Sequence, residues 1–376
     1  MVLLENRDRT LPLAKTIRRV AVIGPLADSP IDLTGGMSPA GMFTRNADEP
    51  AVTVLAALKS RLPDARISHV AGPTPGKTYP GMFDMFSGAK QPTPPTEAET
   101  ADWVRRSRAA ADSADLVIAV VGEMATMSGE SASRATINLP GIQEQMVEAA
   151  AAAGKPLVVV LVNGRPLQIN WIADHAQAVL EAWLPGIEGG NAVADILFGD
   201  VDPGGKLPVS WPRAAGQYPL YYNHNLTQQP ENAPGFTSRY WDLASTPRYP
   251  FGHGLSYTTF RFANLQLAKP GMKAGESTTV RVEVTNTGSV AGDVVAQLYI
   301  HQRSGSASRP VRQLEGFQRV PLEAGETRTL TFTLGRSELQ FWSPATKRWV
   351  VEPSVFDVWV GESSTAELHG ELTVRP

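Results

Sequence analysis

Four short apolar runs constrain the fold of this chain more than any other feature. They read RVAVIG at residues 19–24, LVIAVV at 116–121, LVVVLV at 157–162 and AVLEAWL at 178–184. Runs of this length, rich in β-branched residues, are typical of strands buried on both faces of a parallel sheet. Parallel neighbours need a long crossover connection, usually a helix. The runs therefore predict an α/β fold built in layers.

The segments between these runs have helical spacing, as such a fold requires. Glu97 and Glu99 open one of them, where acidic side chains suit the helix dipole, and Gly154 ends another as a C′ glycine. The alternation predicts a layered α/β sandwich with a mostly parallel sheet over residues 1–215. The expected helices lie at 53–62, 97–114, 142–153 and 191–198, with further strands at 67–70 and 207–211.

The pattern changes in the second half of the chain. Residues 216–261 are rich in Tyr, Pro, Asn and Gly and have little periodicity, so we expect a linker that packs on the domains. Residues 262–376 alternate between apolar and polar side chains, as in half-buried strands. This spacing predicts an immunoglobulin-like β-sandwich of about seven strands. The clearest expected strands are 280–285, 294–300, 329–334 and 356–360.

Composition excludes several classes of function. The net charge is −3 and there is no basic block, which argues against a nucleic-acid partner. No apolar run approaches the roughly 18 residues of a membrane span. The chain has no cysteine, and its six histidines show no paired metal-ligand spacing, so we expect no disulfide and no metal. Nucleotide-binding glycine motifs are also missing, and no cofactor is expected.

The loop after residues 116–121 is the best candidate site in the sequence. About fifteen polar residues separate this apolar run from the Leu139-Pro140-Gly141 that opens the next helix, and they include Glu123, Glu130, Ser133 and Arg134. Ligands of open α/β sheets collect outside the carboxyl ends of the strands, where this loop begins. A long polar loop without a fold role of its own is a candidate binding or catalytic segment.

Several long motifs resemble one known family. Residues 181–200 read EAWLPGIEGGNAVADILFGD, 203–212 read PGGKLPVSWP, 249–260 read YPFGHGLSYTTF and 309–317 read RPVRQLEGF. These motifs, in this order, resemble the C-terminal part of glycoside hydrolase family 3 enzymes, and most of all the bacterial periplasmic β-glucosidases. The resemblance covers nearly the whole chain. It implies that the β-sandwich is a fibronectin type III-like domain.

The resemblance also implies an enzymatic role. In the family, an N-terminal barrel supplies an aspartate nucleophile and the α/β sandwich supplies the general acid/base. This chain has no counterpart of the barrel and resembles the family from the start of the second domain. We therefore expect a β-glucoside or oligosaccharide substrate, and a family 3 barrel as partner, in cis or in trans. The alternative is a non-catalytic carbohydrate-binding or interaction module.

The resemblance says less about the compartment. Relatives are often periplasmic or secreted. The first residues, MVLLENRDRTLPL, have charges where a signal peptide has an apolar core. They are expected instead to continue from an upstream segment.

The family's acid/base transfers to one position, Glu130 in Gly129-Glu130-Ser131-Ala132-Ser133-Arg134. Glu123 is the competing residue, although at the end of a strand it is expected to bond the backbone of the loop. The alternative is that both are merely solvated loop acids. To donate a proton, Glu130 has to be covered by a barrel and a sugar.

Four residues are expected to contact substrate: Met37, Glu123, Ser133 and Arg134. Met37 stands where related loops often carry an aromatic side chain beside the sugar. The alternative is that Met37 is simply packed against its neighbours and has no contact with substrate. Arg134 is expected either to orient Glu130 or to pair with a local acid. Arg165 follows the run at 157–162 and is expected to form an interdomain salt bridge. The face that meets the barrel should expose apolar area.

Overall fold

The computed structural model describes residues 1–36, 51–76, 93–226 and 239–376. The chain divides into two compact units. The first unit contains Met1–Gly205 and Pro212–Tyr218, and the second contains Lys206–Trp211 and Pro219–Pro376. Each unit is described by itself.

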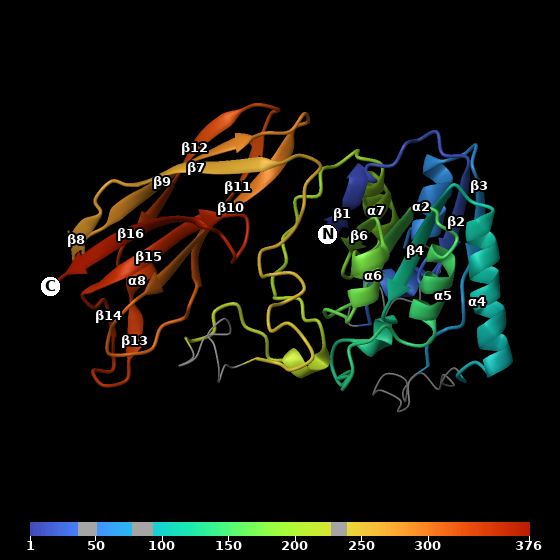
Figure 1. Cartoon of the computed structure of the whole chain (residues 1–376), viewed down its shortest axis with the longest axis horizontal. Coiled ribbons are helices and arrows are strands. Elements are labelled where there is room, and N and C mark those ends of the chain that lie inside the picture. The colour runs from blue at the N-terminus through green and yellow to red at the C-terminus, as the bar shows by residue number, and fades with distance from the viewer. Residues whose placement is uncertain (37–50, 77–92, 227–238) are drawn as a thin grey trace. The chain divides into compact units, whose positions relative to one another are not determined.

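The first unit is built on a six-stranded sheet in the order β1-β6-β5-β4-β2-β3 (Figure 1). Strands β2 to β6 are parallel to their neighbours, and β1 pairs with β6 in the antiparallel direction. All residues of β4 and β5 are buried, which explains why their sequences carry no polar alternation. The strands are β1 (Val2–Asn6), β2 (Arg19–Ile23), β3 (Arg66–Val70), β4 (Leu116–Gly122), β5 (Leu157–Val162) and β6 (Ala178–Glu181).

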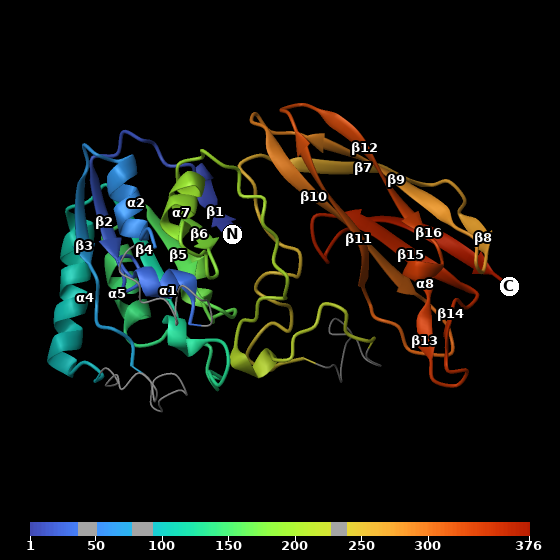
Figure 2. The same cartoon turned by 180° about the vertical axis from the view of Figure 1, so that it is seen from behind.

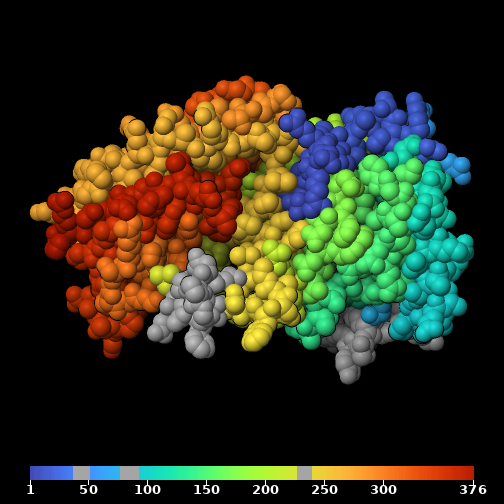
Figure 3. Space-filling view, viewed as in Figure 1, coloured from blue at the N-terminus to red at the C-terminus, as the bar shows by residue number. Residues whose placement is uncertain are grey.

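Helices cover both faces of this sheet. One face carries α4 (Glu97–Asp112), α5 (Gln143–Ala151) and α6 (Asn170–His175), as Figure 1 shows. The other carries α1 (Pro30–Thr34), α2 (Val54–Arg61) and α7 (Gly189–Leu197), as Figure 2 shows. The outward side of α4 is open to solvent at the edge of the unit (Figure 3).

The strand order places a topological switch point between β2 and β4. The connection from β2 leads to β3 at one edge, whereas the connections from β4 lead through β5 to β6 at the other. Loops that leave the carboxyl ends of β2 and β4 therefore run in opposite directions, and ligands of open α/β sheets bind in the crevice between such loops. The candidate loop starts at this place.

The layered α/β fold with a mostly parallel sheet is confirmed, and the sequence missed three details. The antiparallel strand β1 was not predicted. Strand β6 ends at Glu181, three residues earlier than expected. The prediction of a sheet strand at 207–211 is wrong. The backbone N–H groups of Leu207 and Trp211 donate to the carbonyls of His253 and Tyr249, and the segment belongs to the second unit.

The second unit is a β-sandwich, as expected. One sheet has the order β11-β10-β15-β16-β8, a second has β12-β9-β7, and β13 pairs with β14 in a small hairpin. Alternate side chains of β9 and β12 are buried, which matches their alternating sequences. The strands are β7 (Phe260–Leu267), β8 (Gly271–Lys273), β9 (Thr278–Asn286), β10 (Gly292–Gln302), β11 (Gln313–Leu322), β12 (Thr327–Leu334), β13 (Phe341–Ser343), β14 (Arg348–Val350), β15 (Ser354–Gly361) and β16 (Leu368–Arg375).

The core of this sandwich is formed by side chains from both sheets. Val282 and Phe332 come from the three-stranded sheet, and Leu298 and Phe356 from the five-stranded sheet. A short helix, α8 (Arg336–Leu339), adds Leu339. Among the described residues, no helix combines the length and apolar character needed to cross a membrane.

Candidate active site

Polar residues gather at the carboxyl edge of the parallel sheet in the first unit. Glu123 follows β4 directly, Asn163 and Arg165 follow β5, and Glu181 is the last residue of β6. Neighbouring parallel strands end at the same edge, so the sheet brings these residues together although they are far apart in the sequence.

The candidate loop begins at a closely packed point. Gly122 has a φ of +147°, and a Cβ atom there would lie 1.9 Å from the carbonyl oxygen of Val162, so only glycine fits. The buried side chain of Gln143 bonds both backbone groups of Gly122: it accepts from the N–H at 2.9 Å and donates to the carbonyl at 2.8 Å. The two ends of the loop are thus joined at its base.

The carboxylate of Glu123 is held between two arginines. Its side chain is 1% exposed. It accepts from Arg134 Nη1 at 2.7 Å and from Arg165 Nε at 3.2 Å. Burying a carboxylate is unfavourable unless it is paired and hydrogen-bonded in this way.

Each of the two arginines continues to the backbone of the loop. Arg134 Nη2 donates to the carbonyl of Asn138 at 2.9 Å. Arg165 Nη2 donates to the carbonyls of Met127 and Ala132, the latter at 2.7 Å. Glu123 therefore orders the loop through guanidinium groups.

Glu130 lies at the exposed tip of this loop. It occupies a turn in which the Ala132 N–H donates to the Gly129 carbonyl at 3.3 Å. The residues on both sides are left-handed, Gly129 with a φ of +105° and Ser131 with a φ of +55°. A non-glycine residue in this conformation is uncommon and is concentrated at functional sites.

A second buried carboxylate fixes the start of the loop. Asp32, in the α1 segment after β2, accepts from the Ala125 N–H at 2.6 Å and from Ser29 Oγ at 2.6 Å. Burial raises the pKa of Asp32 above its ordinary value, against these two hydrogen bonds. The bond between Asp32 and Ala125 links the loops after β2 and β4.

A third buried carboxyl, Glu181, supports the turn after β5. It accepts from the Trp183 N–H at 2.7 Å and from Asn163 Nδ2 at 3.1 Å. Burial raises the pKa of Glu181 well above its ordinary value. Asn163 Nδ2 also donates to the carbonyl of Arg165 at 2.9 Å. Glu181 therefore acts on the backbone that carries Arg165.

The structure corrects the expected partners of Glu123 and Arg165, and of the two alternatives for Arg134 it shows the pairing with a local acid. Glu123 was expected to bond the backbone of the loop, but its buried carboxylate binds two guanidinium groups instead. Its expected contact with substrate stays a prediction. The ion pair of Arg165 forms inside the first unit, not between domains. Arg134 pairs with the local acid Glu123. Ser133 is exposed beside Glu130, and Met37 lies outside the described residues.

Apolar side chains are exposed around the same edge. Ile31 is 50% exposed, Leu184 38% and Ile187 49%. They belong to the segments after β2 and β6, which are joined by the hydrogen bond from the Gly186 N–H to the Leu33 carbonyl. Apolar exposure was expected on the face that meets the barrel, and that this edge is that face stays a prediction.

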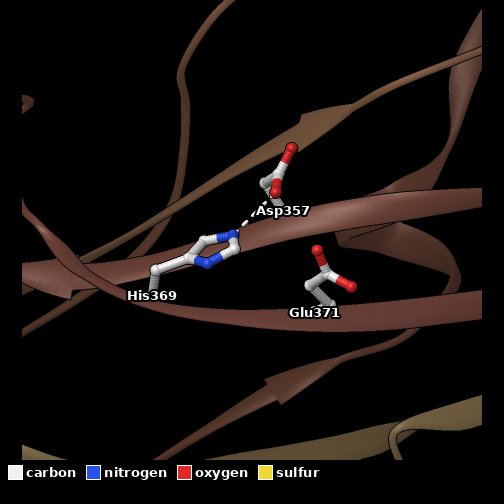
Figure 4. Close-up of side chains that lie close together, drawn as sticks. All are labelled: Asp357, His369 and Glu371. Carbon is white, nitrogen blue, oxygen red and sulfur yellow. Dashed lines mark hydrogen bonds and ion pairs between the residues drawn. The ribbon is translucent and has the colours of Figure 1, made fainter.

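A second cluster of polar residues lies on strands β15 and β16 of the second unit. Asp357, His369 and Glu371 offer metal-ligand atoms within 4.8 Å of one another (Figure 4). The guanidinium group of Arg303 binds these carboxylates: it donates to Asp357 at 3.0 and 2.6 Å and also to Glu371. His369 Nε2 lies 2.6 Å from Asp357. The cluster is a network around Arg303.

Sequence reasoning missed Asp32, Glu181 and the loop-binding role of Arg165. A signal for Arg165 was present, because it closely follows the buried run at 157–162, much as Glu123 follows the run at 116–121, whereas Glu181 lies inside the run expected at 178–184. Polar residues in this position share one edge of a parallel sheet. No such signal marked Asp32.

Comparison with known proteins gives the family. The model of the glycosyl hydrolase family 3 C-terminal domain matches residues 1–257, and that of the fibronectin type III-like domain matches residues 294–364. The chain belongs to the glycosyl hydrolase family 3 C-terminal domain family.

Individual relatives agree with this assignment. The chain is 43% identical over 378 residues to the periplasmic β-glucosidase of Salmonella typhimurium, covering 99% of this chain and 48% of that protein. It is 38% identical to a β-xylosidase of Formosa agariphila, covering 98% and 47%. The crystal structure of a Listeria innocua β-glucosidase with isofagomine superposes with a TM-score of 0.85 at 36% identity, covering 99% and 48%. The chain thus spans about half the length of these relatives.

Proposed function

We propose that this chain is the acid/base half of a retaining β-glucosidase, with Glu130 as the general acid and base. The position of Glu130 carries the proposal. It presents an exposed carboxyl at the tip of a loop that is anchored on both sides, at the sheet edge where α/β proteins bind ligands. The β-glucosidases among its relatives support the choice of reaction.

Retaining hydrolysis requires two carboxyl groups about 5–5.5 Å apart. One attacks the anomeric carbon. The other protonates the leaving oxygen and then, once ionised, activates a water molecule. Glu130 takes the second role, and the nucleophile comes from a family 3 barrel domain, in the same polypeptide or another. The exposed Ile31, Leu184 and Ile187 offer this barrel an apolar surface to cover.

The remaining assignments follow from this proposal. Ser133 contacts the sugar beside Glu130, and Met37 lines the cleft. The proposed domains are residues 1–215 for the catalytic α/β domain, 216–261 for the linker and 262–376 for the fibronectin type III-like domain, although Lys206–Trp211 groups with the second compact unit. The substrate is a β-glucoside or a β-linked oligosaccharide, and the relatedness to a β-xylosidase makes β-xylosides the competing class.

The test is hydrolysis of aryl β-glucosides and aryl β-xylosides by the purified chain, with and without an added family 3 barrel domain. We expect activity only with the barrel and its loss in Glu130→Gln. The matched control is Glu97→Gln, an exposed glutamate at the start of α4. Activity of the chain alone contradicts the division of roles. No activity in either condition favours a non-catalytic carbohydrate-binding module.

A further inference from the structure

We propose that Arg165 is a positioning residue that holds the tip of the acid/base loop in its working geometry. The inference rests on the proposed function of Glu130. It assigns a role in catalysis to a side chain that is only partly exposed and that follows β5, whereas the acid/base loop follows β4.

The hydrogen bonds of Arg165 close the loop into a ring. Its Nη2 atom donates to the carbonyls of Met127 and Ala132, which stand on either side of Glu130. The six residues from one carbonyl to the other therefore start and end at one nitrogen atom. Their most exposed part is the turn that carries Glu130.

Three contacts hold Arg165 in place, one at its guanidinium group and two at the backbone of its turn. Glu123 accepts from Nε, and Asn163 Nδ2 donates to the carbonyl of Arg165. At Gly164 a Cβ atom would lie 2.4 Å from Ser128 Oγ, so the loop packs directly on the turn that carries the arginine. The buried Glu123 therefore serves to align Arg165.

Lysine cannot replace this arginine. The planar guanidinium bonds Glu123 with one nitrogen and two carbonyls with another, whereas an ammonium group is a single point charge on a flexible stem. A carboxyl that must donate a proton has to lie within about 2.6–3.2 Å of the leaving oxygen. A displacement of about 1 Å can lower a rate on the order of 10²-fold.

The choice of leaving group separates positioning from general damage. Cleavage of a 2,4-dinitrophenyl β-glucoside needs little protonation of its leaving oxygen, whereas cleavage of a phenyl β-glucoside depends on it. With the chain and the barrel domain combined, we expect Arg165→Lys to lower kcat/KM for the phenyl glucoside about 10- to 100-fold. We expect kcat/KM of Arg165→Lys for the dinitrophenyl glucoside to stay within about 3-fold of wild type. Glu130→Gln should likewise lose more activity on the phenyl glucoside than on the dinitrophenyl glucoside.

The matched control is Arg18→Lys. Arg18 is an exposed arginine before β2, at the amino edge of the sheet, and it should leave both substrates unaffected. An equal loss on both substrates in Arg165→Lys, or no loss on either, overturns the proposal.

A second measurement separates this inference from the proposed function. If the wild-type chain with the barrel hydrolyses neither substrate, the proposed function fails. The positioning of the loop by Arg165, which we call the clamp, is then tested on the chain alone. Hydrogen exchange at the Ala132 amide, which bonds the Gly129 carbonyl, should then be at least about 10-fold faster in Arg165→Lys than in wild type or Arg18→Lys. Unchanged exchange overturns the clamp.

Discussion

Each unit of this protein contains a carboxylate that binds arginine, but the two networks differ in burial. Glu123 is 1% exposed, and its partners Arg134 and Arg165 are 19% and 23% exposed. In the second unit the central carboxylate, Asp357, is 11% exposed, but its partner Arg303 is 43% exposed and the outer Glu371 54%. The buried network bonds loop carbonyls, whereas the exposed one ties side chains of neighbouring strands together. The difference indicates that ion pairs are buried where a loop needs a fixed shape.

The largest expected effect comes from breaking the buried network. Glu123→Ala leaves two arginines without their carboxylate inside the protein, and loss of one partner from a buried pair costs about 3–5 kcal/mol. Hydrogen exchange of the β4 and β5 amides reports on the first unit alone. The exposed Glu130→Ala serves as control and should stay within about 0.5 kcal/mol of wild type. Equal losses in the two variants contradict the assigned difference.

A half-buried acid, Glu315, should make the stability of the second unit depend on pH. Burial raises the pKa of Glu315 to about 7, and Glu338 adds to the rise. The folded state therefore prefers the protonated form, so stability is full below about pH 4.5 and falls as the pH rises to about 7. The shift corresponds to about 3 kcal/mol at most, and partial solvation reduces this to about 1–2 kcal/mol.

Denaturant unfolding of the second unit at pH 5 and pH 8 measures this effect. In Glu315→Gln the difference between the two pH values should shrink, because the titrating group is gone. If the variant keeps the full difference, other groups are responsible.

Removing Arg303 tests the exposed network. The pKa of Asp357 is lowered, because hydrogen bonds from Arg303 and His369 outweigh the opposing effect of burial. Arg303→Ala should destabilise the second unit by about 1 kcal/mol. It also leaves Asp357, His369 and Glu371 without their cation, so Zn²⁺ should stabilise the variant. Zn²⁺ should leave the wild-type unfolding midpoint unchanged; a wild-type response would show that the arginine does not occupy the site.

The smallest effect is expected at the outer end of the same network. Glu371 is 54% exposed, and exposed ion pairs contribute about 0–1 kcal/mol. Glu371→Gln should therefore change the free energy of unfolding by no more than about 0.5 kcal/mol. A loss as large as that of Glu123→Ala would remove the contrast between the two networks.

The parallel sheet was predictable because its two central strands, β4 and β5, are buried along their whole length and carry no polar side chains. Strand β1 was not, since its place depends on pairing with β6, far away in the sequence. In the sandwich, β8, β13 and β14 have three residues each, too few to show a period.

The exposed place of Glu130 in a loop after β4 followed from the sequence, and its catalytic role stays a prediction. The pairing of Arg134 with a local acid was one of two expectations for it. The partners of Glu123 and Arg165 were not predicted, because a charged side chain in a loop has the same appearance in a sequence whether it contacts solvent, substrate or another charge. Only the geometry of the sheet edge brings Arg165 to the carbonyls of Met127 and Ala132.

The bonds between Gly122 and Gln143 have a consequence for engineering this protein. They close residues 123–142 into an insert whose two ends stay together whatever lies between them. Lengthening a closed loop costs little, about 0.6 kcal/mol for each doubling. Changes in length are therefore best made at the exposed residues 129–131, where β4 and α5 keep their register and the buried Glu123 keeps its arginines.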